Sequence, residues 1–134
     1  MTTVERRTRT GHVKRTEAAA LAAALRERIA GEVRFDTGSR ALYATDSSNY
    51  RQVPIGVVIP KSIEDVVATV ALCREFGAPL LNRGGGTSLA GQCCNVAVVL
   101  DSSKYLNRVL EIDPDRRSAR VQPGVVLDHL RDQA

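Results

Sequence analysis

Three consecutive glycines at 84–86 are the most informative feature of this sequence. They belong to the stretch Arg83-Gly84-Gly85-Gly86-Thr87-Ser88-Leu89-Ala90-Gly91, which directly follows the apolar residues Leu80 and Leu81. Glycine adopts positive φ angles without steric penalty and has no Cβ, so several backbone N–H groups can converge on one anion. The stretch is therefore predicted to cradle a phosphate group.

Two better-known phosphate loops do not fit this spacing. Gly86 and Gly91 match the start of a nucleoside triphosphatase loop, but Gln92 and Cys93 stand where a Lys and a Ser or Thr are needed. The G-x-G-x-x-G dinucleotide fingerprint fails as well, because Leu89 occupies the third glycine position when the count starts at Gly84. A lone Gly-Gly-Gly is more often a flexible turn, so the assignment depends on its neighbours.

The elements before the loop are predicted to be a strand, a helix and a second strand. Residues 54–60 form an apolar run of strand length. Ser62 suits a helix N-cap with Asp65 in the capping-box position, and Gly77 with Pro79 is typical of a helix end. Apolar residues recur at helical spacing between them: Ile63, Val66, Val67, Val70 and Cys73. This βαβ order places the loop at the carboxyl end of the second strand, where open α/β sheets bind ligands.

Further strands are predicted after the loop. Residues 96–100 are too apolar for a sheet with one face in water, and Asp101 closes this run. Residues 109–112 and 119–122 flank a polar turn with proline, which predicts an antiparallel hairpin. Residues 125–130 begin a helix. The predicted fold class is α/β (α+β), with a small parallel sheet followed by an antiparallel hairpin.

The first 53 residues divide into a tail and a lead-in. Residues 1–15 hold five basic side chains against one acidic one and account for the whole net charge of +4, so we expect a disordered basic tail. Residues 16–53 should contain a helix capped by Thr16 and ended by Gly31. Its apolar stripe comprises Ala18, Leu21, Ala22, Leu25 and Ile29. Residues 36–39 and 46–49 are predicted turns.

Composition limits the class of protein. Residues 16–134 carry balanced charge and five scattered aromatic side chains, which argues against specific nucleic-acid binding. There is no signal-peptide core and no transmembrane run, so a cytoplasmic location is expected. Cys73 is expected to pack in the core, and the adjacent Cys93 and Cys94 fit neither a disulfide nor a metal site. With His12 and His129 as the only histidines, no catalytic residue and no metal ligand are assigned.

The order of these motifs resembles the FAD-linked oxidase family, which has the FAD-binding PCMH-type domain of vanillyl-alcohol oxidase and p-cresol methylhydroxylase. The similarity is greatest to the branch of D-lactate dehydrogenase and the glycolate oxidase subunit. It runs collinearly from Tyr43 to Leu130. The residues that carry it are Val57-Val58-Ile59-Pro60, Ser62-Ile63-Glu64-Asp65-Val66, the loop from Arg83 to Gly91, the strand ending in Asp101, and Val121-Gln122-Pro123-Gly124-Val125.

The resemblance implies a cofactor and its contacts. Backbone N–H groups from Arg83 to Gly91 would wrap the FAD pyrophosphate, and Pro123 and Gly124 would lie near the flavin. Members that attach FAD covalently through this loop carry a histidine where this chain has Thr87, so non-covalent FAD is implied.

The resemblance also implies an activity for a longer protein. Residues 54–134 would be the N-terminal part of the FAD-binding domain, truncated before the catalytic domain. A complete enzyme would oxidise a 2-hydroxy acid of the D-lactate or glycolate type, and this chain alone is expected to be inactive. The alternative is a non-catalytic interaction module that completes a flavin domain with a second chain.

Overall fold

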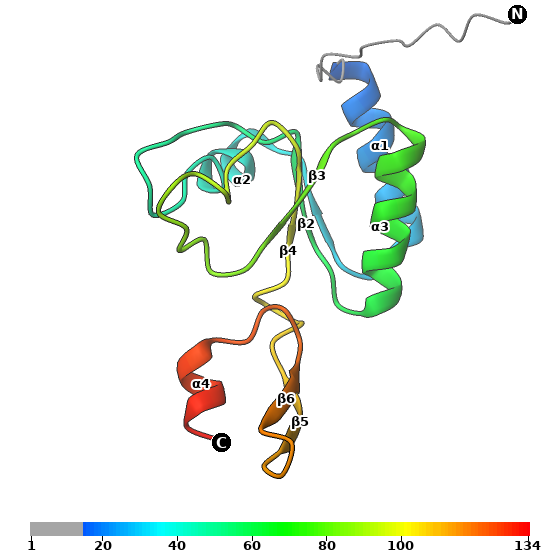
Figure 1. The fold of residues 1–134 in the computed structure, drawn as a ribbon. Coiled ribbons are helices and arrows are strands. Elements are labelled where there is room, and N and C mark those ends of the chain that lie inside the picture. The colour runs from blue at the N-terminus through cyan, green and yellow to red at the C-terminus, as the bar shows by residue number, and fades with distance from the viewer. Residues whose placement is uncertain (1–14) are drawn as a thin grey trace, which may run out of the picture.

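The computed structural model describes residues 15–134, and side chains from residue 17 onward. The predicted tail of residues 1–15 lies almost wholly outside this range. The described chain contains ten elements (Figure 1). They are α1 (Arg15–Arg28), β1 (Glu32–Arg34), α2 (Thr37–Leu42), β2 (Gly56–Ile59), α3 (Ile63–Glu75), β3 (Leu80–Arg83), β4 (Val98–Asp101), β5 (Val109–Asp113), β6 (Ser118–Val121) and α4 (Leu127–Arg131).

Four of the strands form one sheet in the order β1-β2-β4-β3. β4 pairs in parallel with β2 on one side, with Val57 opposite Val99, and with β3 on the other, with Leu81 opposite Val99. Every residue of β2 and β4 is buried, as the apolar runs predicted. The βαβ unit β2-α3-β3 is confirmed, and β4 lies between its two strands. The predicted fold class is therefore correct.

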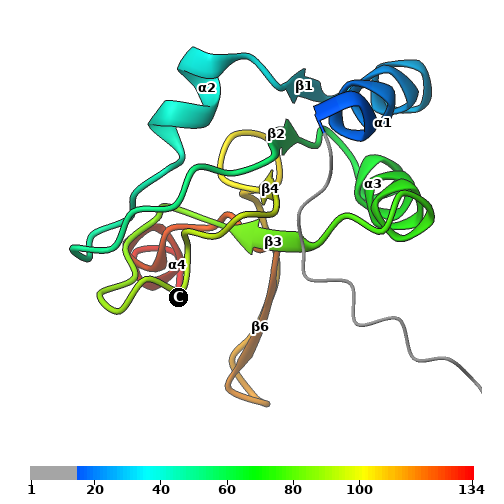
Figure 2. The ribbon, with the colours of Figure 1, turned by 90° about the horizontal axis from the view of Figure 1, so that it is seen from above.

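Helices α1 and α3 lie side by side on one face of the sheet, and α2 and the long loops lie on the other (Figure 2). The core between the two helices and the sheet includes Leu21, Leu25, Leu72, Val58 and Val98. On the opposite face, Val57, Ile59 and Val99 pack against Tyr43, Leu81 and Tyr105. The glycine loop therefore belongs to the layer opposite α1 and α3.

The predicted ends of α3 are present, with one difference. The Ser62 side chain accepts a hydrogen bond from the Asp65 N–H at 3.3 Å, and Gly77 has φ +62°. The Asp65 carboxylate does not complete a capping box. It accepts hydrogen bonds from the N–H groups of Ala30 and Lys61, both at 2.9 Å. Asp65 therefore ties the end of α1 to the start of α3.

The apolar stripe predicted on α3 is largely wrong. Ile63 and Val67 are more than 60% exposed and Val70 is 46% exposed, whereas Thr69, Leu72 and Cys73 are buried. Thr69 can be buried because its hydroxyl donates a hydrogen bond to the Asp65 carbonyl at 2.7 Å. Thr69, Leu72 and Cys73 thus belong to the face of α3 that packs inward.

The lead-in also differs from expectation. Residues 36–39 are not a simple turn, because Asp36 caps α2 by accepting a hydrogen bond from the Ser39 N–H at 2.8 Å. β1, which pairs antiparallel with β2, was not foreseen. The turn at residues 46–49 is confirmed: Asp46 Oδ1 accepts a hydrogen bond from the Ser48 N–H at 2.9 Å.

The helix limits of α1 are corrected in two places. The helix is already formed at Arg15, so Thr16 lies inside it, and it ends at Arg28 rather than at Gly31. A Cβ on Gly31 would lie 2.5 Å from the Ile59 carbonyl oxygen, so this glycine allows close approach to β2. The predicted stripe of α1 is confirmed, with Leu21 and Leu25 fully buried.

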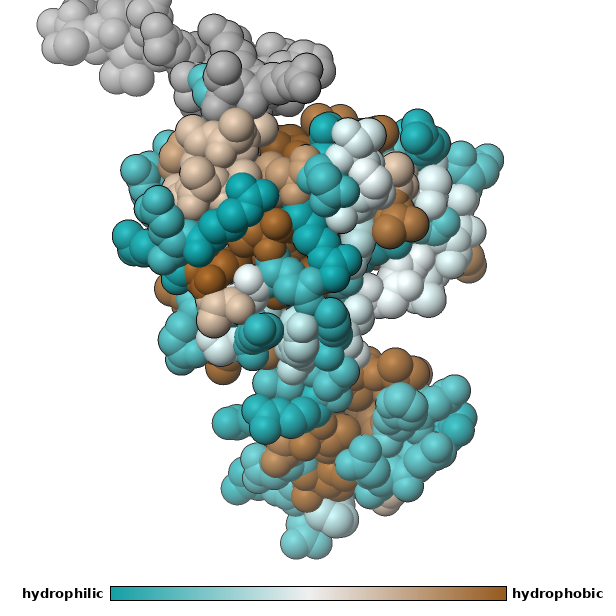
Figure 3. Space-filling view, turned by 180° about the vertical axis from the view of Figure 1, so that it is seen from behind, coloured by the Kyte–Doolittle hydropathy of each residue, from teal (hydrophilic) through white to brown (hydrophobic). Residues whose placement is uncertain are grey.

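Strands β5 and β6 form the predicted antiparallel hairpin, below the main sheet in Figure 1. Exposed apolar side chains gather on the hairpin and on the start of α4, where Figure 3 shows brown patches on the lower lobe. They are Leu110, Val121, Val126 and Leu127. No helix within residues 15–134 is long and apolar enough to cross a membrane.

Candidate functional site

The glycine loop connects the carboxyl end of β3 to the amino end of β4. Because these two strands are parallel neighbours, the loop must return along the length of the sheet. Gly85, Thr87 and Leu89 are exposed, whereas Gly86 is buried. Part of the loop is therefore open to a ligand, and Gly86 anchors it.

Two glycines of the loop need their conformational freedom. Gly86 has φ +69° and Gly91 has φ +79°, while Gly84 and Gly85 do not have positive φ. A Cβ on Gly86 would lie 2.4 Å from Arg83 Nη2, and one on Gly91 would lie 2.8 Å from the Tyr50 ring. Of the three consecutive glycines, only Gly86 thus has a positive φ.

The amides at the centre of the loop are unpaired. Among residues 15–134, the N–H groups from Gly85 to Ser88 donate to no protein group. The carbonyl of Gly86, in contrast, accepts a hydrogen bond from the Ser47 N–H at 3.0 Å. Unpaired donors on a partly exposed glycine turn are what an anion-binding loop requires.

Arg83 lies against the body of the loop. Its Nη1 donates hydrogen bonds to the carbonyls of Thr45 at 2.8 Å and Cys93 at 3.0 Å. The guanidinium also lies over the Tyr43 ring, 5.3 Å from the centroid. Within the described chain Arg83 forms no salt bridge, so its charge adds to the positive potential around the loop.

Tyr43 joins the loop to the end of β4. Its hydroxyl donates a hydrogen bond to Asp101 Oδ2 at 2.6 Å, and Asp101 Oδ1 accepts another from the Ser103 N–H at 2.8 Å. Burial, and then the hydrogen bond to Asp101, raise the pKa of Tyr43 to about 12. Tyr43 is consequently a neutral donor at ordinary pH.

The second predicted contact lies beside the first. A Cβ on Gly84 would lie 3.7 Å from the Pro123 carbonyl oxygen. The Gly124 N–H donates a hydrogen bond to the Leu106 carbonyl at 2.8 Å, and a Cβ on Gly124 would lie 2.2 Å from the Ser102 carbonyl oxygen. The structure therefore brings together Gly84 and Pro123, which are far apart in sequence. Leu89 and Ala90 are exposed on the outer part of the loop.

Tyr43 and residues 45–48 were not predicted as neighbours of the loop. The only available signal was the turn-forming composition of residues 46–49, which indicates local structure but not its distant partner.

Two of the three cysteines are buried, and His129 is exposed. Cys73 is buried, as expected, and burial raises the pKa of its thiol to about 11. Cys93 Sγ lies 3.0 Å from Ser88 Oγ, and Cys94 is buried. His129 is exposed on α4, and His12 lies outside the described residues. Within residues 15–134, no group of three or more His, Cys, Asp or Glu could hold a metal ion.

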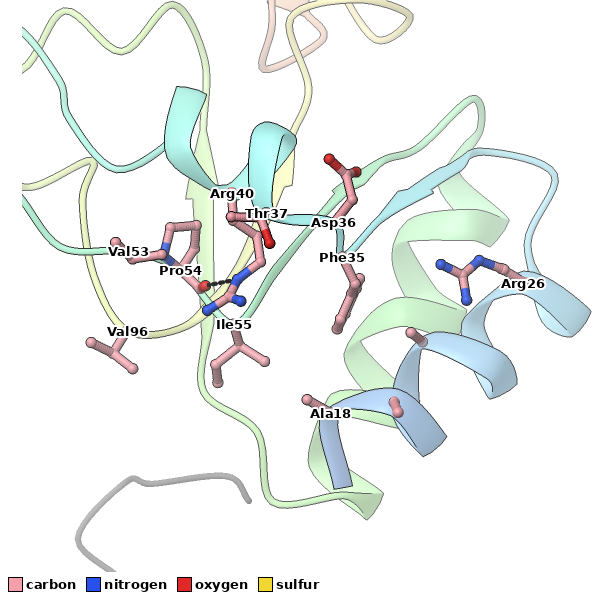
Figure 4. Close-up of a pocket in the computed structure, with 12 residues that line it drawn as sticks. Ala18, Arg26, Phe35, Asp36, Thr37, Arg40, Val53, Pro54, Ile55 and Val96 are labelled. Atoms are coloured by element: carbon pink, nitrogen blue, oxygen red, sulfur yellow. Dashed lines mark hydrogen bonds between the residues drawn. The ribbon is translucent and has the colours of Figure 1, made fainter. Parts of the chain in front are cut away.

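A hollow of about 890 Å³ lies away from the glycine loop, between α1, α2 and residues 53–55 (Figure 4). Its lining includes Phe35, Arg26 and Arg40, and Arg40 Nε donates a hydrogen bond to the Pro54 carbonyl at 2.7 Å. None of its lining residues belongs to the stretch from Arg83 to Gly91. The hollow is therefore separate from the candidate site.

Comparison with known proteins agrees with this fold. A family model described as an FAD binding domain matches residues 54–134, which is more than half of the chain. The chain belongs to this FAD-binding domain family, found in FAD-linked oxidoreductases, and the resemblance drawn from the sequence is confirmed.

Two curated relatives illustrate the relationship. D-2-hydroxyglutarate dehydrogenase of Escherichia coli (strain K12) is 35% identical over 103 residues, covering 75% of this chain and 10% of the relative. Glycolate oxidase subunit GlcD of Bacillus subtilis (strain 168) is 34% identical over 109 residues, covering 77% of this chain and 23% of the relative. The chain thus spans between a tenth and a quarter of the length of these relatives.

Among solved structures, p-cresol methylhydroxylase with substrate bound superimposes with a TM-score of 0.76 at 22% sequence identity. The match covers 90% of this chain and 25% of that one. At this identity the comparison supports the fold alone.

Proposed function

We propose that this chain binds FAD non-covalently and holds its pyrophosphate at the loop from Arg83 to Gly91, with Pro123 and Gly124 as a second contact. The observation that carries the proposal is the row of unpaired amides from Gly85 to Ser88, in a loop where Gly85 and Thr87 are exposed. Such donors match a pyrophosphate, which presents several negatively charged oxygens. The positive charge of Arg83 also suits this anion, and the Pro123 carbonyl lies beside Gly84.

Non-covalent attachment is supported by the side chains of the loop. From Arg83 to Gly91 there is no histidine, tyrosine or cysteine, and Thr87 is the first residue after the glycines. The nearest thiol, that of Cys93, lies within hydrogen-bonding distance of the Ser88 hydroxyl.

We further propose that the domain serves an oxidoreductase acting on a 2-hydroxy acid. The names of both curated relatives refer to such acids, D-2-hydroxyglutarate and glycolate. When bound, FAD supplies a two-electron acceptor for this oxidation. The part assigned to this chain is to bind and orient the cofactor, with residues 16–53 as a lead-in to the domain at residues 54–134. A cytoplasmic location also stays a prediction.

An interaction module is the second candidate. The apolar side chains of Leu110, Val121, Val126 and Leu127 are exposed by 38–75%, which favours contact with a further polypeptide that completes the flavin domain. This function is compatible with FAD binding. A partner chain that covered the hairpin would lie near Pro123, beside the glycine loop, and would not replace the loop.

The test is an NMR titration of the 15N-labelled chain, which at 14.5 kDa suits this method. Adding FAD to millimolar concentration should shift the amide signals from Gly84 to Ser88 and of Gly124 more than those of α1. Riboflavin, which has no phosphate, should leave the loop amides unshifted. Equal shifts throughout the chain, or none, would contradict the proposal.

A further inference from the structure

The turn at residues 45–48 contacts the glycine loop near its start, at its middle and just beyond its end. The three hydrogen bonds are Arg83 Nη1 to the Thr45 carbonyl at 2.8 Å, the Ser47 N–H to the Gly86 carbonyl at 3.0 Å, and the Cys93 N–H to Asp46 Oδ2 at 3.1 Å. A single short turn therefore braces the whole loop, although about 40 residues separate the two segments.

Asp46 organises this turn. Its Oδ1 accepts hydrogen bonds from the Ser48 N–H at 2.9 Å and the Ser48 hydroxyl at 2.5 Å, while Oδ2 accepts from Cys93. These hydrogen bonds, that from the Ser48 side chain first, and the nearby Arg83 lower the pKa of Asp46. The negative charge of the Asp46 carboxylate is therefore stabilised by these donors, although the neighbouring loop is itself suited to binding an anion.

The brace also sets the direction of a loop amide. The Gly86–Thr87 peptide bond is trans, so the Gly86 C=O and the Thr87 N–H point in opposite directions. Because Ser47 holds the Gly86 carbonyl, the Thr87 N–H must point away from the turn. If the turn released Gly86, this peptide could rotate and turn its carbonyl toward an incoming phosphate.

We propose that Asp46 is a positioning residue for FAD: it holds the 45–48 turn against Gly86 and Cys93, and thereby keeps the loop amides directed at the pyrophosphate. This inference rests on the proposed function. In this role Asp46 would not touch the cofactor itself. It acts through the hydrogen bonds of Ser47 and Cys93.

The test compares FAD affinities, from the loop amide shifts, of the full chain and three variants. Asp46→Ala should bind FAD about tenfold more weakly, as expected when a charge-assisted hydrogen bond is lost. Asp46→Asn keeps only one of the two acceptor oxygens, because its NH2 group cannot accept from an N–H, and should recover only part of the affinity. Asp36→Ala is the matched control, because Asp36 also accepts a backbone N–H but caps α2. Its FAD affinity should be unchanged.

Each possible result bears on either the role of Asp46 or the proposed function. Wild-type affinity in a folded Asp46→Ala chain would overturn the inference but not the proposed function, whereas loop amides of the wild type that fail to respond to FAD would overturn the proposed function. If Asp46→Ala does not fold, hydrogen exchange in the wild type is decisive. The Ser47 and Cys93 amides should exchange more slowly than that of Thr87, and equal exchange rates would overturn the brace.

Discussion

Gly86 is the residue at which the backbone of the loop is most constrained. A side chain there meets two obstacles, the positive φ of 69° and the Arg83 guanidinium 2.4 Å from the Cβ position. We expect Gly86→Ala to lower the free energy of unfolding by about 1–2 kcal/mol and to weaken FAD binding at least tenfold, because Arg83 must move. Thermal unfolding and NMR titration measure the two effects.

Gly77 provides the control for this substitution. It has a similar φ of 62° but lies at the end of α3. Gly77→Ala should cost comparable stability and leave FAD affinity unchanged. Equal losses of affinity in the two variants would show that general destabilisation, not the loop, is responsible.

Because of Tyr43, the stability of the folded chain should depend on pH in the alkaline range. Its pKa is about 12 in the folded chain, against an ordinary value of 10. A raised pKa means that the folded state binds the proton more tightly, so the resulting stability is complete below pH 10 and is lost as the pH rises toward 12. We expect the thermal midpoint to fall over this range in the wild type and to fall less in Tyr43→Phe. Identical pH profiles would contradict the assignment.

At the level of single residues, the glycine loop could be predicted from the sequence, but the residues that hold it in place could not. Glycines indicate a local need for backbone freedom, so the stretch from Arg83 to Gly91 could be recognised from its composition together with the predicted strand, helix and strand before it. Tyr43 and Asp46 reach Asp101 and Cys93, which are 58 and 47 residues away. Such contacts depend on the folded topology and leave no local pattern.

Between elements, Asp65 is the main polar connection. Its buried carboxylate holds the N–H groups of Ala30 and Lys61, so it joins α1, α3 and the end of β2. Asp65→Ala should lower the free energy of unfolding by about 2 kcal/mol, since two backbone donors lose their partner. Chemical denaturation measures this loss. Asp65→Asn should recover part of it, and the exposed neighbour substitution Glu64→Gln should have little effect.

The helices and strands also show where prediction from the sequence fails. The buried strands β2 and β4 were predictable because both faces are apolar. The three-residue β1 is instead fixed by pairing with β2, and by Glu32, which accepts hydrogen bonds from Lys104 and Tyr105. These donors, Lys104 first, and Arg34 hold the pKa of Glu32 at about 2. In α3, Ile63 and Val67 have the spacing of a buried helical face, but both side chains are exposed, so this spacing indicated the wrong face of the helix.

For the whole molecule, we expect the purified 134-residue chain to be colourless after gel filtration with excess FAD. Each exposed backbone hydrogen bond contributes about 1 kcal/mol net, and a few of them do not offset the cost of immobilising a large dinucleotide. The visible spectrum of the protein peak is the measurement. A yellow monomer with one FAD per chain would show that these residues alone suffice for tight binding.

The position of β4 has a consequence for how the molecule folds. β4 is the last of the four sheet strands along the chain, yet it lies inside the sheet, between β2 and β3. Those two strands have no hydrogen-bonded contact without it, so a nascent chain cannot assemble the parallel part of the sheet before residues 98–101 leave the ribosome. The glycine loop is the segment that must close for β4 to insert, and its closure carries an entropic cost. We therefore expect the cofactor loop to close in the same step in which β4 completes the sheet.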